Sequence, residues 1–188
     1  MSDRNQRRSA HRQSVTMAMC GMAAGLSVAV MLLGAVIPVA TYAAPLLCGL
    51  LLLPVMTEFG RREAWITFAV TSLVALTLGA DKEAAFFYLF LGWYPLVKWH
   101  LDRIHARPLR VLVKLLIFTL ALTTMYALLA LVLHLDAITQ DLGAMGVLGL
   151  VLFLAVFDVC MLMYDRLLLP LMMLYATRIR PKLRFLRR

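Results

Sequence analysis

Long apolar runs separated by short polar connections dominate this chain. Charges, prolines and glycines mark the breaks between them, and about 20 helical residues cross a hydrocarbon layer of roughly 30 Å. A helix is the expected spanning element because it satisfies its own backbone hydrogen bonds within lipid. The predicted spans are residues 15–37, 41–57, 64–79, 84–98, 111–134 and 144–168. We therefore predict an all-α integral membrane protein whose six-helix bundle occupies residues 15–176.

The third and fourth predicted spans are short and are joined by the charged stretch GADKEA, residues 79–84. One continuous helix through this stretch would bury Asp81, Lys82 and Glu83 near the bilayer centre, at about 3 kcal/mol each. A tight hairpin between two helices is therefore predicted here.

Composition and charge support this interpretation. The chain is 63% apolar with a mean hydropathy of +0.86, outside the range of soluble domains. Every Lys and Arg except Lys82 and Arg166 falls on one predicted side, which includes basic tails at residues 1–14 and 177–188. Short cytoplasmic loops collect positive charge. We therefore expect the chain to lie in a bacterial cytoplasmic membrane with both termini in the cytoplasm. We expect its net charge of +9 to attract anionic lipid rather than nucleic acid.

Sequence motifs of catalysis and cofactor binding are missing. The chain has no Gly-rich phosphate loop, no H-E-x-x-H, no G-x-S-x-G and no C-x-x-C. We therefore expect neither an enzyme nor a protein with a bound cofactor or metal.

Two aspartates interrupt the last apolar run, VLFLAVFDVCMLMYDRLLLP. Asp158 is expected near the bilayer midplane, where a carboxylate must face the bundle, be protonated or hold a partner. It is a candidate for proton or cation handling or for contact with a partner subunit, and the alternative is a hydrogen bond to a neighbouring helix. Asp165 is expected at the inner interface, solvated among headgroups. Glu58 and Arg166 are the candidate partners on that side.

Small residues follow one face of the first predicted span. Gly21, Gly25 and Ala29 are each four residues apart, so they share a helix face and allow close approach of another helix. We name these three residues the small-residue stripe. Its two interpretations are packing inside the bundle and docking of a different membrane protein.

A group of polar and aromatic residues is expected on the outer side. We name it the outer polar residues, and its members are Tyr42, Asp81, Tyr88 and His134. They either line a small-molecule cavity or belong to an aromatic belt with solvated loop charges.

The whole pattern resembles the substrate-binding S component of energy-coupling factor transporters. The likeness rests on six spans, both ends inside, the small-residue stripe, a Pro-containing connection after the first span (VIPVATYAAP) and no ATPase motif. The resemblance implies a membrane subunit that binds a micronutrient on the outside and works with a transmembrane coupling protein and two cytoplasmic ATPases. It also implies docking of the coupling protein on the stripe, although Gly replaces the family's usual Ala at two of the three positions. The outer polar residues are then the pocket candidates.

A membrane scaffold without a small-molecule substrate is the alternative, since rod-shape morphogenesis membrane proteins have a similar size and span count. The loop at 98–110 and the tail at 178–188 would then be the working surfaces. Asp158 would serve as a helix-pairing residue.

Overall fold

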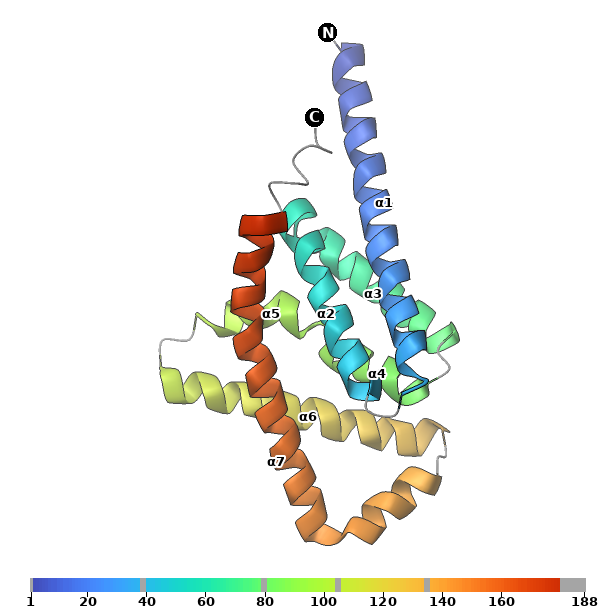
Figure 1. The fold of residues 1–188 in the computed structure, drawn as a ribbon, viewed down its shortest axis with the longest axis vertical. Coiled ribbons are helices and arrows are strands. Elements are labelled where there is room, and N and C mark those ends of the chain that lie inside the picture. The colour runs from blue at the N-terminus through green and yellow to red at the C-terminus, as the bar shows by residue number, and fades with distance from the viewer. Residues whose placement is uncertain (1, 38–39, 79–80, 104–105, 134–135, 180–188) are drawn as a thin grey trace. The chain divides into compact units, whose positions relative to one another are not determined.

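The protein folds into helices throughout the part that the structure describes. The structure is a computed structural model that describes residues 2–37, 40–78, 81–103, 106–133 and 136–179. Every regular element in these ranges is helical, so the predicted all-α class is confirmed. The elements, labelled in Figure 1, are α1 (Ser2–Gly34), α2 (Ala40–Phe59), α3 (Arg61–Leu78), α4 (Lys82–Leu91), α5 (Tyr94–Leu101), α6 (Arg107–Leu133), α7 (Asp136–Leu174) and a π-helical turn η1 (Tyr175–Ile179).

Four helical segments are long and apolar enough to cross a membrane. They are Gln13–Gly34, Ala40–Phe59, Arg107–Leu129 and Leu148–Arg178. These segments overlap the first, second, fifth and sixth predicted spans. Such segments are typical of a membrane protein, because a helix of about 20 apolar residues matches the hydrocarbon thickness.

The remaining two predicted spans correspond to shorter helices. α3 has 18 residues, and Asp81 starts α4 as its N-cap, so the chain breaks into two helices near GADKEA as predicted. The predicted span 84–98, however, is divided into α4 of 10 residues and α5 of 8 residues. The backbone N–H of Gly92 ends α4 by donating to the carbonyl of Tyr88 at 2.7 Å. Pro95 then occupies the first turn of α5, a position that proline favours. The number of spans therefore stays a prediction.

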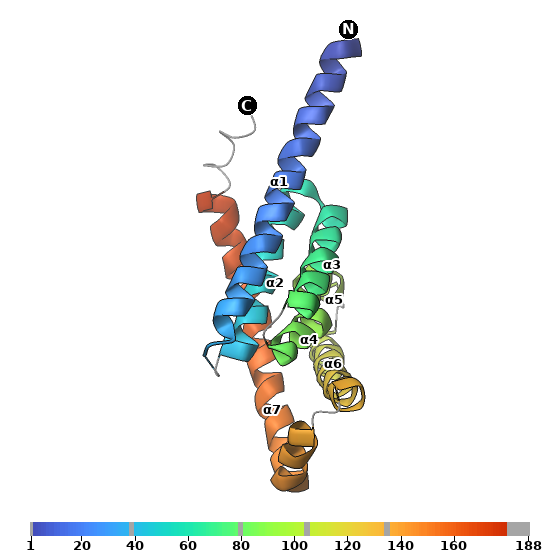
Figure 2. The same cartoon turned by 90° about the vertical axis from the view of Figure 1, so that its right-hand side faces the viewer.

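The chain divides into two compact units, residues 1–96 and 97–188. In the first unit, α2 contacts α1, α3 and α4, and α1 also contacts α3. Figures 1 and 2 show α1 and α2 side by side, with the N-terminal part of α1 extending past the other helices of this unit. The core of the unit includes the buried side chains of Cys48, Leu52, Phe68 and Tyr88.

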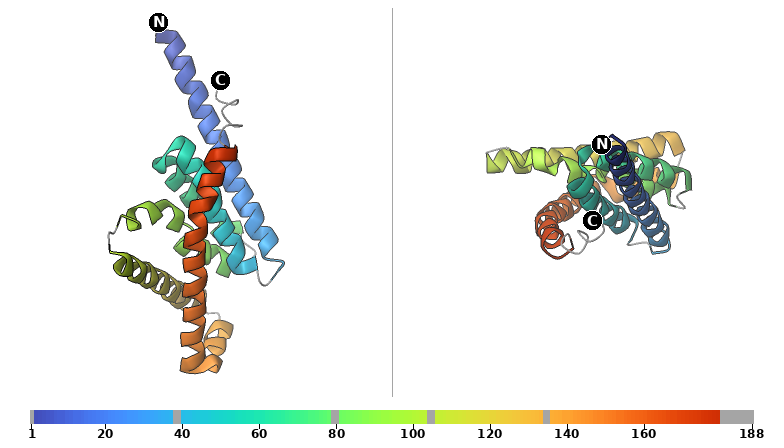
Figure 3. Two further views of the ribbon diagram at one scale, coloured as in Figure 1. Left: turned by 60° about the vertical axis from the view of Figure 1, so that its left-hand side comes forward. Right: turned by 90° about the horizontal axis from the view of Figure 1, so that it is seen from above.

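The second unit begins within α5 and contains α6, α7 and η1. α6 and α7 contact each other, and Figures 1 and 3 show that α7 crosses α6. α7 changes direction at Gly146, whose φ of 64° and ψ of 176° are not helical. A positive φ is readily adopted by glycine because it has no Cβ. The long apolar part of α7 begins after this kink, close to the start of the sixth predicted span.

Candidate functional site

Tyr42 and Asp81 lie at the N-terminal ends of two contacting helices, α2 and α4. The Tyr42 hydroxyl donates to Oε1 of Glu83 at 2.7 Å, and its ring meets the ring of Phe87 edge-on at 5.5 Å between centroids. The Asp81 carboxylate accepts from the backbone N–H of Glu83 at 2.9 Å and of Ala84 at 3.3 Å. Two of the outer polar residues are thus brought to the same end of the first unit, with Glu83 contacting both.

Tyr88 lies in the interior of the first unit. Its side chain is fully buried, and its ring packs on Phe68 at 5.3 Å between centroids. The Tyr88 hydroxyl lies near Thr71 but has no hydrogen-bond partner among the described residues. His134, the fourth outer polar residue, lies outside the described residues. The structure therefore groups Tyr42 with Asp81 and assigns Tyr88 to the core.

The small-residue stripe lies on an exposed face of α1. A Cβ added to Gly21 or Gly25 would meet no atom within 4 Å, and Ala29 is exposed. The packed face of α1 carries Ser27 instead, which is buried and whose backbone carbonyl accepts from the Cys48 thiol at 3.1 Å. Packing of α1 within the first unit therefore uses a different face from the stripe.

Asp158 is held by a neighbouring helix. The Thr119 hydroxyl on α6 donates to its Oδ2 at 3.0 Å. Its other oxygen, Oδ1, is buried without a hydrogen-bond partner in the part of the chain that the structure describes. Thr119 is the type of partner that a helix-pairing role predicts, because a hydroxyl is a common hydrogen-bond donor between membrane helices.

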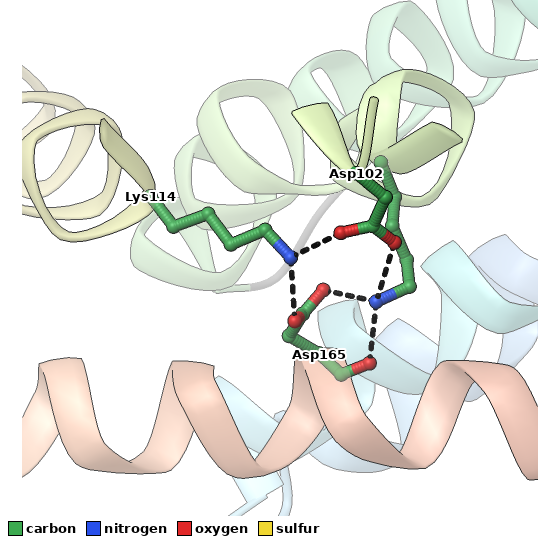
Figure 4. A network of polar contacts seen from close by, with 4 residues as sticks. Asp102, Lys114 and Asp165 are labelled. Atoms are coloured by element: carbon green, nitrogen blue, oxygen red, sulfur yellow. Dashed lines mark hydrogen bonds and ion pairs between the residues drawn. The ribbon is translucent and has the colours of Figure 1, made fainter. Parts of the chain in front are cut away.

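Asp165 belongs to a group of four charged residues in the second unit, shown in Figure 4. We name this group the charge quartet, and its members are Lys98 on α5, Asp102 just after α5, Lys114 on α6 and Asp165 on α7. The Lys114 ammonium lies 2.7 Å from Asp165 Oδ2 and 2.7 Å from Asp102 Oδ1. The Lys98 ammonium lies 3.4 Å from Asp102 Oδ2, pairs with Asp165 Oδ1 and donates to the Asp165 backbone carbonyl at 2.8 Å.

The quartet is closely paired and mostly buried. The side chains of Lys98, Lys114 and Asp165 are 8%, 4% and 11% exposed, whereas that of Asp102 is 32% exposed. Two positive and two negative groups leave no net charge. This balance matters because the loss of one partner from a buried ion pair leaves the other charge without a partner, at a cost of roughly several kcal/mol.

The structure corrects the expectation for Asp165. We predicted a carboxylate solvated among headgroups with Glu58 or Arg166 nearby, but Asp165 is buried and pairs with two lysines. Both lysines belong to the positive charges that the sequence places on the cytoplasmic side. One signal was available in the sequence, because Lys114 falls inside the predicted span 111–134, just as Asp165 falls inside 144–168. Opposite charges at the same end of two neighbouring spans favour pairing.

The described residues offer no metal centre. No group of three or more His, Cys, Asp or Glu side chains lies close enough to hold a metal ion within the part of the chain that was searched. The two carboxylates of the quartet already contact ammonium groups, which are poor neighbours for a bound cation.

Comparison of the chain with protein-family models, curated proteins and solved structures finds no match. The function is therefore inferred from the contacts described above.

Proposed function

We propose that this chain is the membrane-embedded, substrate-binding subunit of a micronutrient uptake system in a bacterial cytoplasmic membrane. In this proposal it has six spans with both termini in the cytoplasm, and it works with a separate transmembrane coupling protein and cytoplasmic ATPases. The four apolar helical segments and the one-sided distribution of Lys and Arg support the membrane assignment.

The observation that carries the proposal is the outward position of the small-residue stripe within the apolar segment Gln13–Gly34. The exposed positions beside it hold large side chains such as Met22 and Leu26. Lipid tails contact large and small apolar side chains equally well, whereas a second helix approaches closely only over small ones. The stripe therefore favours a helix from outside the first unit as its neighbour, and in the proposal this helix belongs to the coupling protein.

The polar end of the first unit is the proposed solute site. Tyr42, Glu83 and Asp81 supply a hydroxyl and two carboxylates, and Phe87 supplies an aromatic ring that fixes the Tyr42 ring edge-on. A small number of polar groups beside aromatic rings is typical of small-molecule sites. In the proposal these groups recognise the polar atoms of the micronutrient.

A scaffold function without a solute is the second candidate, and the same end of the first unit provides the observation that favours it. The Tyr42 hydroxyl donates to Glu83, the Asp81 carboxylate caps α4, and the Lys82 ammonium donates to the Leu76 carbonyl at 2.9 Å. These groups therefore form hydrogen bonds within the chain itself. In the scaffold alternative, the stripe docks a partner and these residues only stabilise the fold.

The first test measures solute binding by the purified protein in detergent. Its thermal unfolding is followed with vitamins, nucleobases, amino acids and divalent metals, since a ligand that binds only the folded state raises the melting temperature by mass action. Tyr42→Phe removes the hydroxyl but keeps the ring contact with Phe87, so a shift that depends on Tyr42 should shrink in this variant. Trp65→Phe, at an exposed position on α3, is the control and should leave the shift unchanged.

The second test measures docking through the stripe. Gly25→Leu should not lower the melting temperature of the purified protein, because a Cβ at this position meets no atom within 4 Å, but it should remove a coupling protein and ATPases that co-purify from native membranes. Met22→Leu, at another exposed position of α1, is the matched control and should retain them. Solute binding together with stripe-dependent docking supports the uptake subunit, and docking alone supports the scaffold. A Gly25→Leu variant that keeps its partners would contradict both.

A further inference from the structure

The two carboxylates of the charge quartet have equivalent contacts but different surroundings. Each ammonium contacts both carboxylates, so Asp102 and Asp165 each bridge the same pair of lysines (Figure 4). Asp165 is part of the long helix α7 and is buried. Asp102 lies in the turn after the eight-residue helix α5, and its side chain is a third exposed. Asp102 is therefore the bridging group that can leave with the smaller rearrangement.

Without the Asp102 carboxylate, the two lysines and Asp165 carry a net charge of one positive unit. The vacated position accepts an anion with two oxygens, one facing each ammonium. A phosphodiester has one negative charge and two such oxygens, and lysine is a common phosphate ligand. The charge and the contact geometry of the vacated position therefore match a phosphate group.

The residues around Asp102 have the composition of a membrane interface. Arg103 and Arg107 lie close to Asp102 in the sequence and are exposed. Trp99 and Leu109 also lie close to it in the sequence and are exposed. Tryptophan is enriched at headgroup level, and basic residues close to the inner leaflet attract anionic lipid. A headgroup phosphate is thus the form of phosphate that this surface favours.

We propose that the charge quartet is a binding site for the phosphate of an anionic phospholipid headgroup, and that Asp102 occupies the phosphate position when no lipid is bound. When lipid binds, its phosphate replaces the Asp102 carboxylate between the two lysines, and Asp165 keeps its contacts with both lysines. This site is made of other residues than the solute site and the stripe, so it does not depend on the proposed uptake function.

Two variants separate this proposal from a purely structural ion-pair group. Asp102→Asn removes the internal anion and leaves the site one unit positive, so it should bind the headgroup more tightly than the wild type. Asp102→Asn combined with Lys114→Met restores a balanced pair of Lys98 and Asp165 and removes half of the phosphate contacts. The quartet then has the same net charge as in the wild type, and this double variant serves as the control.

The experiment uses the full chain in nanodiscs of phosphatidylcholine with or without phosphatidylglycerol. Thermal unfolding reports stabilisation, and native mass spectrometry reports how much phosphatidylglycerol stays bound. A third arm adds inorganic phosphate, with chloride at equal ionic strength as its control. We expect the single variant to bind phosphatidylglycerol about tenfold or more tightly than the double variant, from the loss of one charged contact.

Equal retention of phosphatidylglycerol by the single and double variants would overturn the proposal, because the site would then take no anion. Stabilisation by inorganic phosphate without any preference for phosphatidylglycerol would overturn the lipid source and assign the site to free phosphate. If Asp102→Asn does not fold, the wild type and the double variant are compared by native mass spectrometry, and equal lipid retention again refutes the site. Arg107→Gln tests general surface attraction and should weaken lipid binding of both variants alike.

Discussion

Asp165→Asn is the sharpest test of the buried charge quartet. The substitution keeps the size of the side chain but removes its charge, and with it the ion pairs to Lys98 and Lys114. Two ammonium groups, 8% and 4% exposed, then share the single carboxylate of Asp102. The quartet changes from neutral to one positive unit in a largely buried position.

The expected loss in the free energy of unfolding follows from this geometry. Removing one partner of a buried ion pair costs about 3–5 kcal/mol, mostly because a buried charge is left uncompensated. Asp102 still contacts Lys114 at 2.7 Å and Lys98 at 3.4 Å, and Lys98 keeps its bond to the Asp165 backbone carbonyl. These remaining contacts limit the loss, so we expect the lower end of the range, about 3 kcal/mol.

Adding Lys114→Met to Asp165→Asn supplies the decisive comparison. The double variant contains one lysine and one aspartate, Lys98 and Asp102, and is neutral again. It should recover about 2 kcal/mol relative to the single variant, because replacing charged pairs by apolar groups is often close to neutral. A second substitution that restores stability is expected only if the four charges interact with one another.

Unfolding by sodium dodecyl sulfate in mixed micelles, followed by far-ultraviolet circular dichroism, measures these differences. Arg62→Gln removes an exposed charge from α3 and is the control, with an expected change within about 0.5 kcal/mol. A loss below about 1 kcal/mol for Asp165→Asn, or a double variant less stable than the single one, would refute the buried quartet.

Two further substitutions test packing and hydrogen bonding elsewhere by the same unfolding assay. Thr119→Val removes the hydroxyl that donates to Asp158 while keeping the side-chain shape, so we expect a loss of about 1 kcal/mol, and no loss would show that this bond contributes nothing. Gly92→Ala places a Cβ 2.6 Å from the Tyr88 ring and should cost about 1–3 kcal/mol. Gly21→Ala meets no atom within 4 Å and should keep or raise stability, because alanine favours a helix more than glycine does, and equal effects of the two glycine substitutions would contradict the packing described for α4.

Local sequence signals predicted the break between α3 and α4. One continuous helix would place Asp81, Lys82 and Glu83 together near the bilayer centre, which is costly, and Asp81 provides a good N-cap for a new helix. The break between α4 and α5 also had local signals in the sequence, namely the glycine Gly92 and the proline Pro95. We expected one helix over 84–98 because the apolar residues continue through these positions. Apolar character alone does not fix where a helix ends when a glycine and a proline offer a turn.

The roles of the two aspartates could be predicted only in part. A carboxylate in an apolar span requires a partner on a neighbouring helix, and the Thr119 hydroxyl is such a partner for Asp158. For Asp165, depth alone was the basis for expecting solvation. Depth along one helix says nothing about which side chains of other helices reach the same point, and two lysines do.

The sequence by itself determined that this protein is helical and largely apolar, because the length and hydropathy of a run depend only on consecutive residues. It also determined which residues of α1 share a face, since helical periodicity is local. Only the tertiary structure decided that the small-residue stripe faces away from the other helices of the first unit and that Ser27 packs against α2. It also decided the partners in the charge quartet, where Lys98 and Asp165 are 67 residues apart. Ion pairing depends on distance in space, and a single sequence carries no measure of the distance between its helices.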